Sequence, residues 1–470
     1  MGSYKPPMTT STFQRRYLVI GLCGLLAGGC RSKVDLPDLG GLYSEAAQTV
    51  GPGRNPVIVI PGILGSRLVD SQSDRVAWGA FAGDYANPET DDGAQLAALP
   101  MQQGQPLRQL IDGVVSDGAL DRLKVRLLLL SIEQEAYLQI LGTLGVGGYR
   151  DELLGEAGAI DYGDDHFTCF QFDYDWRRDN VENAQRLSQF IQEKRAYVQE
   201  ELKRRYGTDT EVKFDIVAHS MGGLITRYFL RFGDADLPAD GSVPPTTWAG
   251  AQHVERAVLV GTPSAGSVMA LKQLVERVQF APVLPRYGPA LLGTFPSIYQ
   301  LLPRTRHLPV VSAEDPSRSM GDLYDVNLWK RYGWGLANPK LDDMLNVLLP
   351  DVRRADERCA IALDHLEKCL ERARQFAASI DTPAEPPHGL QLFLAAGDAV
   401  DTEAVLGVDR AGGIKSIASE GGDGTVTRRS ALMDERAPDQ KHVRLISPIH
   451  WSGCAVSVYR SSGIDRRPCL

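Results

Sequence analysis

One serine in this 470-residue chain lies in a sequence context that can make it a nucleophile. A short segment at residues 212–217, apolar except at Lys213 and Asp215, is followed by Ala218-His219-Ser220-Met221-Gly222 and then by a helical pattern. This is the pattern of a nucleophile elbow, in which a strand delivers a serine onto a strained turn and a helix begins directly behind it. Small residues flank the serine two positions away because the strand and helix backbones nearly touch. A chance strand–turn–helix junction is the alternative interpretation.

A nucleophilic serine needs a base that takes its proton, and the base needs an acid that orients it. In α/β hydrolases the acid follows the serine in the chain, and the histidine follows the acid. Asp423 lies among glycines, and His450 comes shortly after an apolar strand pattern at 443–446. Order and placement therefore predict Ser220, Asp423 and His450 as a catalytic triad.

Each assignment has an alternative in which the residue serves structure alone. Asp423 fits an ordinary Asp-Gly turn, and Asp398 competes with it for the role of the acid. His450 fits a histidine packed beside the tryptophan that follows it. His442 comes before the strand pattern, so it would face the opposite end of the strand. His219 is interpreted as a structural neighbour of the serine.

Two aromatic segments are also interpreted as structural. The segment Asp175-Trp176-Arg177 is expected to support the site through packing and a buried ion pair, without acting in catalysis. Trp78 and Phe81 are expected in the core, with contact to an acyl chain as the alternative.

The elements that must position the triad follow from the apolar patterns. Residues 57–60 are a continuous β-branched run, as in a buried parallel strand, and a glycine-containing loop at 61–66 follows them. In hydrolases of this architecture the loop after an early strand supplies an oxyanion N–H. Further strands are expected at 168–172, 256–260, 391–395 and 443–446, and helices at 181–206, from 221 to about 232, at 268–280 and at 352–380.

These patterns predict an α/β-hydrolase fold, with a mostly parallel sheet flanked by helices, over residues 56–470. Strand signals vanish from about 264 to 388, so this segment is expected to form a helical cap, or lid, over the carboxyl edge of the sheet. Residues 71–165 show no sustained alternation and are expected to form another cap insertion.

Residues 1–29 have the features of a signal peptide. Basic residues precede an apolar run at 17–26, which is shorter than the roughly 20 residues of a membrane span. The following Ala27-Gly28-Gly29-Cys30 predicts a bacterial lipobox, with Cys30 as the lipidated first residue of a mature lipoprotein and residues 30–55 as a lipidated, flexible tether. The chain is therefore expected to be exported and anchored in the cell envelope. An ordinary cleaved signal that gives a secreted protein, and a twin-arginine route through Arg15-Arg16, stay open.

Composition argues against some classes of function. The net charge is −9, with no dominant cluster of Lys and Arg, so no nucleic acid is expected as a partner. The eight histidines are scattered and the seven cysteines lack zinc-binding spacing, so no metal and no organic cofactor is expected. Five of the cysteines follow Cys30, an odd number for an exported protein.

Several motifs occur in an order that resembles the lecithin:cholesterol acyltransferase family. They extend from about residue 56 to 455 and include His450, and together they are far more specific than any one of them. The cap sequence matches poorly, and the cysteine pair that closes the lid of the secreted vertebrate enzyme has no counterpart between Cys30 and Cys169. The motifs are Pro61-Gly62-Ile63-Leu64-Gly65-Ser66, Tyr174-Asp175-Trp176-Arg177, His219-Ser220-Met221-Gly222, Gly261-Thr262-Pro263, Pro296-Ser297-Ile298-Tyr299 and Gly422-Asp423-Gly424-Thr425-Val426.

The resemblance implies an O-acyltransferase that acts on lipid esters through an acyl-Ser220 intermediate. His450 would be the general base and then the general acid, and Asp423 would hold its imidazole. The backbone N–H groups of Ile63 and Met221 would form the oxyanion hole. The expected partners are a lipid ester as acyl donor, an alcohol as acceptor, and a membrane surface reached through the lipid anchor.

Two other functions stay open. A lipase, phospholipase or esterase would form the same intermediate and use water as the acceptor. An inactive, lipid-binding lipoprotein would turn over no ester. If His450 must be neutral to take the proton of Ser220, activity should fall on acidification with an apparent pKa of about 6–7, and a flat profile from about pH 5 to 8 would contradict that role.

Overall fold

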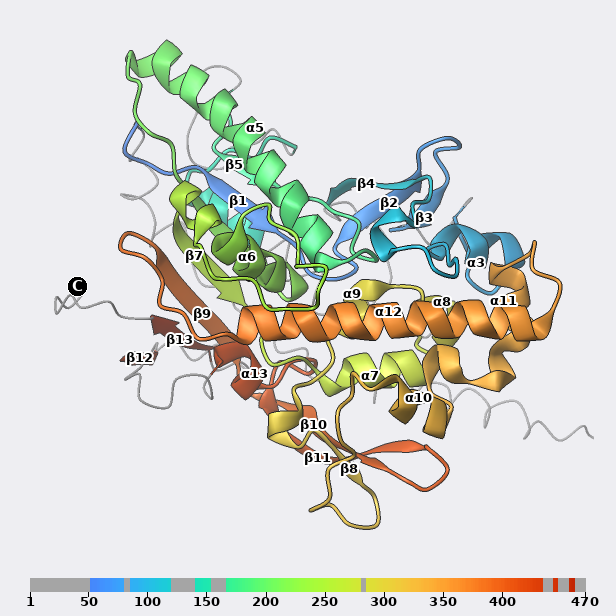
Figure 1. Ribbon diagram of the computed structural model, residues 1–470. Coiled ribbons are helices and arrows are strands. Elements are labelled where there is room, and N and C mark those ends of the chain that lie inside the picture. Colours follow the sequence, from blue (N-terminus) through green and yellow to red (C-terminus); the bar gives the residue numbers. More distant parts are fainter. Residues whose placement is uncertain are drawn as a thin grey trace, which may run out of the picture. The chain divides into compact units, whose positions relative to one another are not determined.

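The computed structural model describes residues 51–79, 85–119, 140–153, 166–279 and 285–433, together with the backbone of two strands at 443–446 and 456–460. A seven-stranded sheet has the strand order β12-β13-β9-β7-β6-β1-β5 (Figure 1). Its strands are β1 (Val57–Ile60), β5 (Cys169–Gln171), β6 (Phe214–His219), β7 (Val254–Val260), β9 (Gln391–Gly397), β12 (Val443–Ile446) and β13 (Val456–Arg460).

The strands from β9 to β5 in this order run parallel to one another. β13 is antiparallel to β9, and β12 is antiparallel to β13, so β12 points in the same direction as β9. The carboxyl ends of β1, β6, β7, β9 and β12 therefore meet at one edge of the sheet, which is where ligands bind in open α/β sheets. The predicted α/β fold with a mostly parallel sheet flanked by helices is confirmed (Figure 1).

The strand β1 and the helix that follows Ser220 lie in the core of the molecule. All residues of β1 are buried, and so are all residues of α6 (Met221–Phe232), which contacts β6, β7, α5 and α12. α5 (Asn180–Tyr206) lies beside α6 (Figure 1). It begins where the Asp179 side chain accepts a hydrogen bond from the Val181 N–H, and it ends at Gly207, whose φ of 66° suits glycine.

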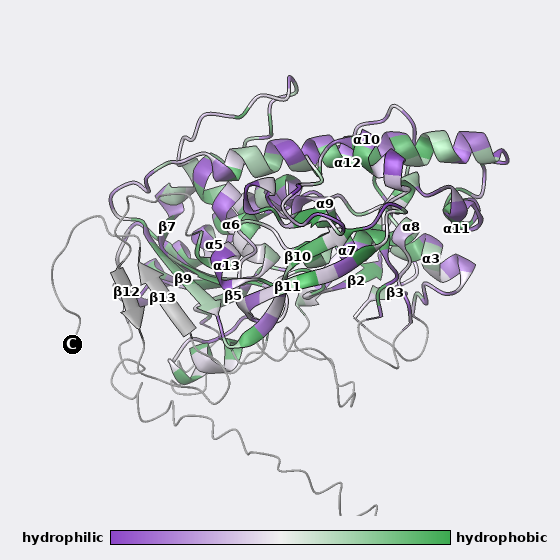
Figure 2. Ribbon diagram, turned by 90° about the horizontal axis from the view of Figure 1, so that it is seen from below, coloured by the Kyte–Doolittle hydropathy of each residue, from purple (hydrophilic) through white to green (hydrophobic). Residues whose placement is uncertain are grey.

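The segment between β7 and β9 is mainly helical, as the sequence predicts. Its longest helix, α12 (Ala355–Asp381), contacts α6, α9 and α11, and hydrophobic and hydrophilic residues alternate along it (Figure 2). The other helices are α7 (Val268–Val275), α8 (Pro289–Leu292), α9 (Pro296–Gln300), α10 (Val326–Tyr332) and α11 (Asp342–Leu348).

Two features of this region differ from the prediction. The short strand β8 (Val310–Ser312) pairs with β10 (Val400–Val408), which pairs with β11 (Ile414–Gly422) in a separate three-stranded sheet. β8 is too short to show alternation, and its partner is distant in sequence. α7 ends at Val275, short of the predicted residue 280, because the chain turns extended and Val278 forms a bridge with Tyr287.

The segment between β1 and β5 contributes another three-stranded sheet, in the order β3-β2-β4. Its elements are β2 (Ser66–Asp70), β3 (Val76–Trp78), α3 (Asp91–Ala97) and β4 (Val114–Ala119). The predicted domain and cap boundaries stay predictions. The remaining short elements are α13 (Arg428–Leu432) and the 3-10 helices at Leu107–Gln109, Ala249–His253, Thr305–His307, Gly335–Ala337 and Pro339–Leu341.

Among the described residues, no helix is both long enough and apolar enough to span a membrane. Cys169, Cys359 and Cys369 have free thiols. Cys359 and Cys369 lie ten positions apart on α12, which separates them by about 15 Å along the helix axis, too far for a disulfide.

Candidate active site

Ser220 stands between the end of β6 and the first residue of α6, as the elbow pattern predicts. Its φ of 51° and ψ of −125° are unusual for a residue with a side chain, and such backbone strain costs about 1–3 kcal/mol. The Ser220 N–H donates a hydrogen bond of 2.8 Å to the Val260 carbonyl at the end of β7, which ties the turn to the neighbouring strand. The serine is 7% exposed.

Two glycines of α6 allow the helix to start this close to the sheet. A Cβ atom at Gly222 would lie 2.4 Å from the Pro61 carbonyl oxygen. At Gly223 it would lie 1.9 Å from the Thr262 hydroxyl oxygen. Both distances are far below van der Waals contact, so the turn cannot form in this way with larger residues at these positions. The steric reason for small residues around the elbow is therefore confirmed on the helix side.

The loop after β1, which we call the Pro61–Ser66 loop, packs directly against the serine. A Cβ atom at Gly62 would lie 2.7 Å from Ser220 Cβ and 3.2 Å from its hydroxyl oxygen. The Gly65 N–H donates a 3.1 Å hydrogen bond to the Gly62 carbonyl, and Leu64 has a positive φ of 65°. Ile63 thus belongs to a tight turn beside Ser220, and Met221 is the first residue of α6.

Three buried aromatic side chains donate hydrogen bonds to carbonyls of the Pro61–Ser66 loop. The Tyr174 hydroxyl donates to Pro61, the Trp78 indole N–H to Leu64 and the Trp176 indole N–H to Ser66, at 2.9, 2.9 and 3.3 Å. Sequence reasoning placed Trp78 in the core, where the structure shows it, but missed its polar contact. A buried indole N–H requires an acceptor, which is the signal that was available.

Asp423 follows β11 and lies where the ends of β7 and β9 come together. A Cβ atom at Gly397 would lie 3.1 Å from Asp423 Cβ, and one at Gly261 would lie 3.1 Å from Asp423 Oδ2. The other carboxylate oxygen, Oδ1, accepts hydrogen bonds of 2.9 and 2.8 Å from the backbone N–H groups of Thr425 and Val426. The competitor, Asp398, directly follows β9 and packs its carbonyl oxygen near Gly421.

His219 is half-buried between the loops that follow β1 and β7. Its Nδ1 lies 3.3 Å from the Cβ position of Gly62, and its Nε2 lies 3.9 Å from that of Gly261. Burial lowers the pKa of His219, and the Asp423 carboxylate acts in the opposite direction. A lowered pKa keeps the imidazole neutral near pH 7.

Other predicted site residues fall outside the described part of the chain. These are His450, the competing His442, the lipidation candidate Cys30, and Phe81. Within the ranges described above, no group of three or more His, Cys, Asp and Glu side chains is arranged to bind a metal.

The expected buried ion pair beside Trp176 is confirmed. Arg177 forms a salt bridge of 2.7 Å with Asp175 and one of 2.8 Å with Asp112, and it also donates to the Ala97 carbonyl. Burial raises the pKa of Asp112, and Arg177 opposes this shift. Through Asp112 and Ala97, Arg177 connects the segment after β5 to the β1–β5 insertion.

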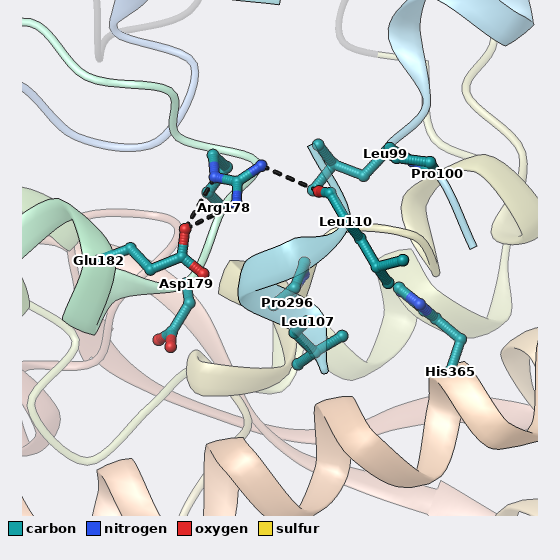
Figure 3. Close-up of a pocket in the computed structure, with 9 residues that line it drawn as sticks. All are labelled: Leu99, Pro100, Leu107, Leu110, Arg178, Asp179, Glu182, Pro296 and His365. Atoms are coloured by element: carbon teal, nitrogen blue, oxygen red, sulfur yellow. Dashed lines mark hydrogen bonds and ion pairs between the residues drawn. The ribbon is translucent and has the colours of Figure 1, made fainter. Parts of the chain in front are cut away.

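A separate small cavity lies among α5, α9 and α12 (Figure 3). Its volume of about 10 Å³ suits about one water molecule and excludes an acyl chain. Arg178 lies on its wall, paired with Glu182 at 2.7 Å and donating to the Leu110 carbonyl at 3.1 Å. Neither Ser220 nor Asp423 lines this cavity.

The sequence and the structure were compared with known proteins, and the sequence matches one family model. A chain in "The crystal structure of Tle4-Tli4 complex" is 14% identical, with a TM-score of 0.49, over 81% of this chain and 89% of that chain. No curated protein matches the sequence. The family model for lecithin:cholesterol acyltransferase matches residues 151–330, a segment that contains α5, the nucleophile elbow and β7. The resemblance to this family that the motifs indicate is therefore confirmed over residues 151–330.

Proposed function

We propose that this protein transfers an acyl group from a lipid ester to an alcohol through a covalent acyl-Ser220 intermediate. The family match supports an enzyme of the acyltransferase or hydrolase kind that acts on lipid esters. The single observation that carries the proposal is the packing of the Pro61–Ser66 loop against Ser220 on its strained turn. This arrangement sets one serine beside two backbone segments that can present N–H groups to an oxyanion.

Asp423 is the acid in this proposal. Two backbone N–H groups of its own turn hold Oδ1, so the carboxylate is fixed without a charged partner. Oδ2 lies near Gly261 and makes no hydrogen bond to any other part of the described chain. A carboxylate with one anchored and one available oxygen is suited to orient an imidazole.

His450 is the base, and the topology of its flanking strands supports this role. β12 ends at Ile446, at the same sheet edge as Ser220, because β12 points in the same direction as β9. β13 begins at Val456, which pairs with Gly397, the glycine against which Asp423 packs. His450 lies between these two strand ends in sequence, and four residues from Ile446 span at most about 14 Å.

The reaction has two halves. The Ser220 hydroxyl oxygen attacks the ester carbonyl carbon while its proton passes to His450. The N–H groups of Ile63 and Met221 stabilise the oxyanion, the proton moves from His450 to the leaving alcohol, and acyl-Ser220 remains. An acceptor alcohol then gives its proton to His450 and attacks the acyl carbon, which forms the new ester. The bond between the acyl carbon and the Ser220 oxygen breaks, and His450 returns the proton to that oxygen.

Labelling with a fluorophosphonate tests the first half. The proposal predicts one labelled residue, Ser220, and loss of both labelling and ester turnover in Ser220→Ala with an unchanged melting temperature. Unchanged turnover in Ser220→Ala would instead indicate an inactive, lipid-binding lipoprotein.

The acceptor is tested by its products. With a phospholipid donor, the proposal predicts a new ester when a long-chain alcohol is present. Release of free fatty acid at the same rate with and without the alcohol would identify a hydrolase, because the same intermediate can react with water.

The proposal extends to the cell envelope through Cys30. Its support is the small-residue stretch before this cysteine and the basic and apolar segments that precede it. In a Ser220→Ala background, which removes the acyl-enzyme, growth with a labelled fatty acid should label the protein that keeps Cys30 and not Cys30→Ser. Labelling of both proteins would contradict acylation at this residue.

A further inference from the structure

Two of the aromatic residues that contact the Pro61–Ser66 loop have a role beyond packing. We propose that Trp78 and Tyr174 are positioning residues that fix the peptide carrying the Ile63 N–H, so that this N–H is set before the oxyanion forms. The inference rests on the proposed acyl-transfer function, since it concerns the same oxyanion hole.

The first contact reaches this peptide in two hydrogen-bonded steps. A peptide unit is planar, so a hydrogen bond to its carbonyl also fixes the direction of its N–H. The Trp78 indole N–H donates to the Leu64 carbonyl at 2.9 Å, which fixes the Leu64–Gly65 peptide. The Gly65 N–H of that peptide donates to the Gly62 carbonyl at 3.1 Å, which fixes the Gly62–Ile63 peptide. The N–H of this second peptide is that of Ile63.

The second contact acts from the other side of Gly62. The Tyr174 hydroxyl donates to the Pro61 carbonyl at 2.9 Å, and its side chain is fully buried. This bond fixes the Pro61–Gly62 peptide, which directly precedes the Gly62–Ile63 peptide. Gly62 has no side chain that could restrain its own backbone, and a Cβ there would lie 2.7 Å from Ser220 Cβ. The restraint on this flexible residue therefore comes from its neighbours.

The donors are themselves held in place. The Trp78 ring is 4% exposed and packs edge-on against Trp176 and Tyr287, with ring centroids 5.4 and 5.7 Å away. Trp78 belongs to the β1–β5 insertion, and Tyr287 belongs to the β7–β9 insertion. Both insertions thus contribute to the geometry of a loop at the edge of the main sheet. Leu64 is in a positive-φ conformation that a leucine rarely adopts, and the Trp78 indole N–H donates to its carbonyl from outside the loop.

The test compares each residue with a chemically matched one elsewhere. Trp329 and Tyr299 are also fully buried, and they donate to the carbonyls of Leu323 and Gly293 at 2.8 and 3.0 Å, which lie outside the Pro61–Ser66 loop. The variants are therefore Trp78→Phe and Tyr174→Phe, with Trp329→Phe and Tyr299→Phe as controls. Benzothienylalanine at position 78 keeps the bicyclic shape and lacks only the N–H, so it covers the case in which Trp78→Phe fails to fold.

Ester turnover and fluorophosphonate labelling of Ser220 are measured for all proteins. We expect kcat and the labelling rate to fall at least about 10-fold in the Trp78 and Tyr174 variants, because an oxyanion donor acts mainly in the transition state, with KM within about 2-fold. The control variants should keep the wild-type kcat, even where their melting temperature falls by as much as that of the Trp78 and Tyr174 variants. Equal kcat in variants and controls, with normal labelling of the wild type, would overturn this inference alone. An unlabelled wild-type Ser220 would overturn the proposed function and this inference with it.

Discussion

The carboxyl edge of the sheet and the helical layer among α5, α9 and α12 handle polar groups in opposite ways. At the edge, Ser220 and Asp423 contact glycines and backbone groups, and neither forms a salt bridge within the described part of the chain. In the helical layer, charged side chains are paired with one another, as the partly buried Arg372 is with the buried Asp179 and with Asp236. The first arrangement leaves the Ser220 hydroxyl and one Asp423 carboxylate oxygen available for a reaction. In the second arrangement, the charged atoms are occupied by ion pairs. Substitutions at the edge should therefore change turnover, and substitutions in the layer should change stability.

The largest effect is expected at the acid. Asp423→Asn removes the charge that orients and stabilises the imidazolium, so turnover should fall about 10⁴-fold with little change in melting temperature. The control is Asp398→Asn, which alters the competing carboxylate at the end of β9 and should leave turnover near the wild-type value. The reverse ranking of the two variants would exchange their roles. Rates of ester release and thermal melts give both quantities.

In the helical layer, the largest effect is expected for Arg372→Met. This change leaves Asp179, with a side chain only 2% exposed, as a buried charge without its partner. Unfolding free energy in urea should fall by about 3 kcal/mol, while kcat stays close to wild type. Arg354→Met breaks an exposed pair with Asp356 and should leave the unfolding free energy close to that of the wild type. A loss of kcat in Arg372→Met without a loss of stability would contradict the claim that the helical layer affects stability and the sheet edge affects turnover.

A smaller effect on turnover is expected for Gly62→Ala. The added methyl group would lie 2.7 Å from Ser220 Cβ, so the Pro61–Ser66 loop or the serine must move. A displacement of this size should lower kcat about 10²-fold. Gly288→Ala is the control, because a Cβ there meets nothing within 4 Å. Wild-type kcat in Gly62→Ala would show that the loop does not need this close approach.

The smallest effect is a pH dependence of the unfolding free energy that a histidine of the helical layer should cause. Burial lowers the pKa of His365 on α12 to about 4, below its ordinary value, and its Nε2 lies 3.1 Å from the Thr294 carbonyl oxygen. Above about pH 6.5 the histidine is neutral in both the folded and the unfolded chain. As the pH falls toward about 4, only the unfolded chain gains the proton, so stability is lost at roughly 1.4 kcal/mol per unit.

Urea unfolding at pH 7 and pH 5 measures this loss. The wild type should lose about 2 kcal/mol more than His365→Asn over this interval, since the variant lacks the titrating group. Identical pH dependence in both proteins would contradict a buried, neutral His365.

The elements that the sequence predicts well are those with local causes. β1 is predicted from its β-branched run. α5 is predicted at 181–206 and observed at Asn180–Tyr206, because the cap residue Asp179 and the final Gly207 directly flank the helical pattern. The elbow at Ser220 is likewise local, since strand, turn and helix follow one another directly.

The features that sequence reasoning missed depend on contacts between distant segments. In the sheet formed by β8, β10 and β11, the paired residues Val310 and Leu406 lie 96 positions apart. The Asp423 turn reaches the main sheet only because β11 ends beside β9. The acceptor of the Trp78 N–H could not be predicted either, because only the folded structure shows which of the many backbone carbonyls lies beside this indole. Periodicity reports which face of an element is buried, and it does not report which partner covers that face.

The central claim is that Ser220 carries the acyl group during turnover, and acid quenching during steady-state reaction with a lipid ester tests it most directly. Digestion and mass spectrometry of the quenched wild type should find the donor's acyl group on the peptide that contains Ser220, and this mass should vanish in Ser220→Ala together with activity. An acyl group on a different residue, or steady turnover by Ser220→Ala, would contradict the account.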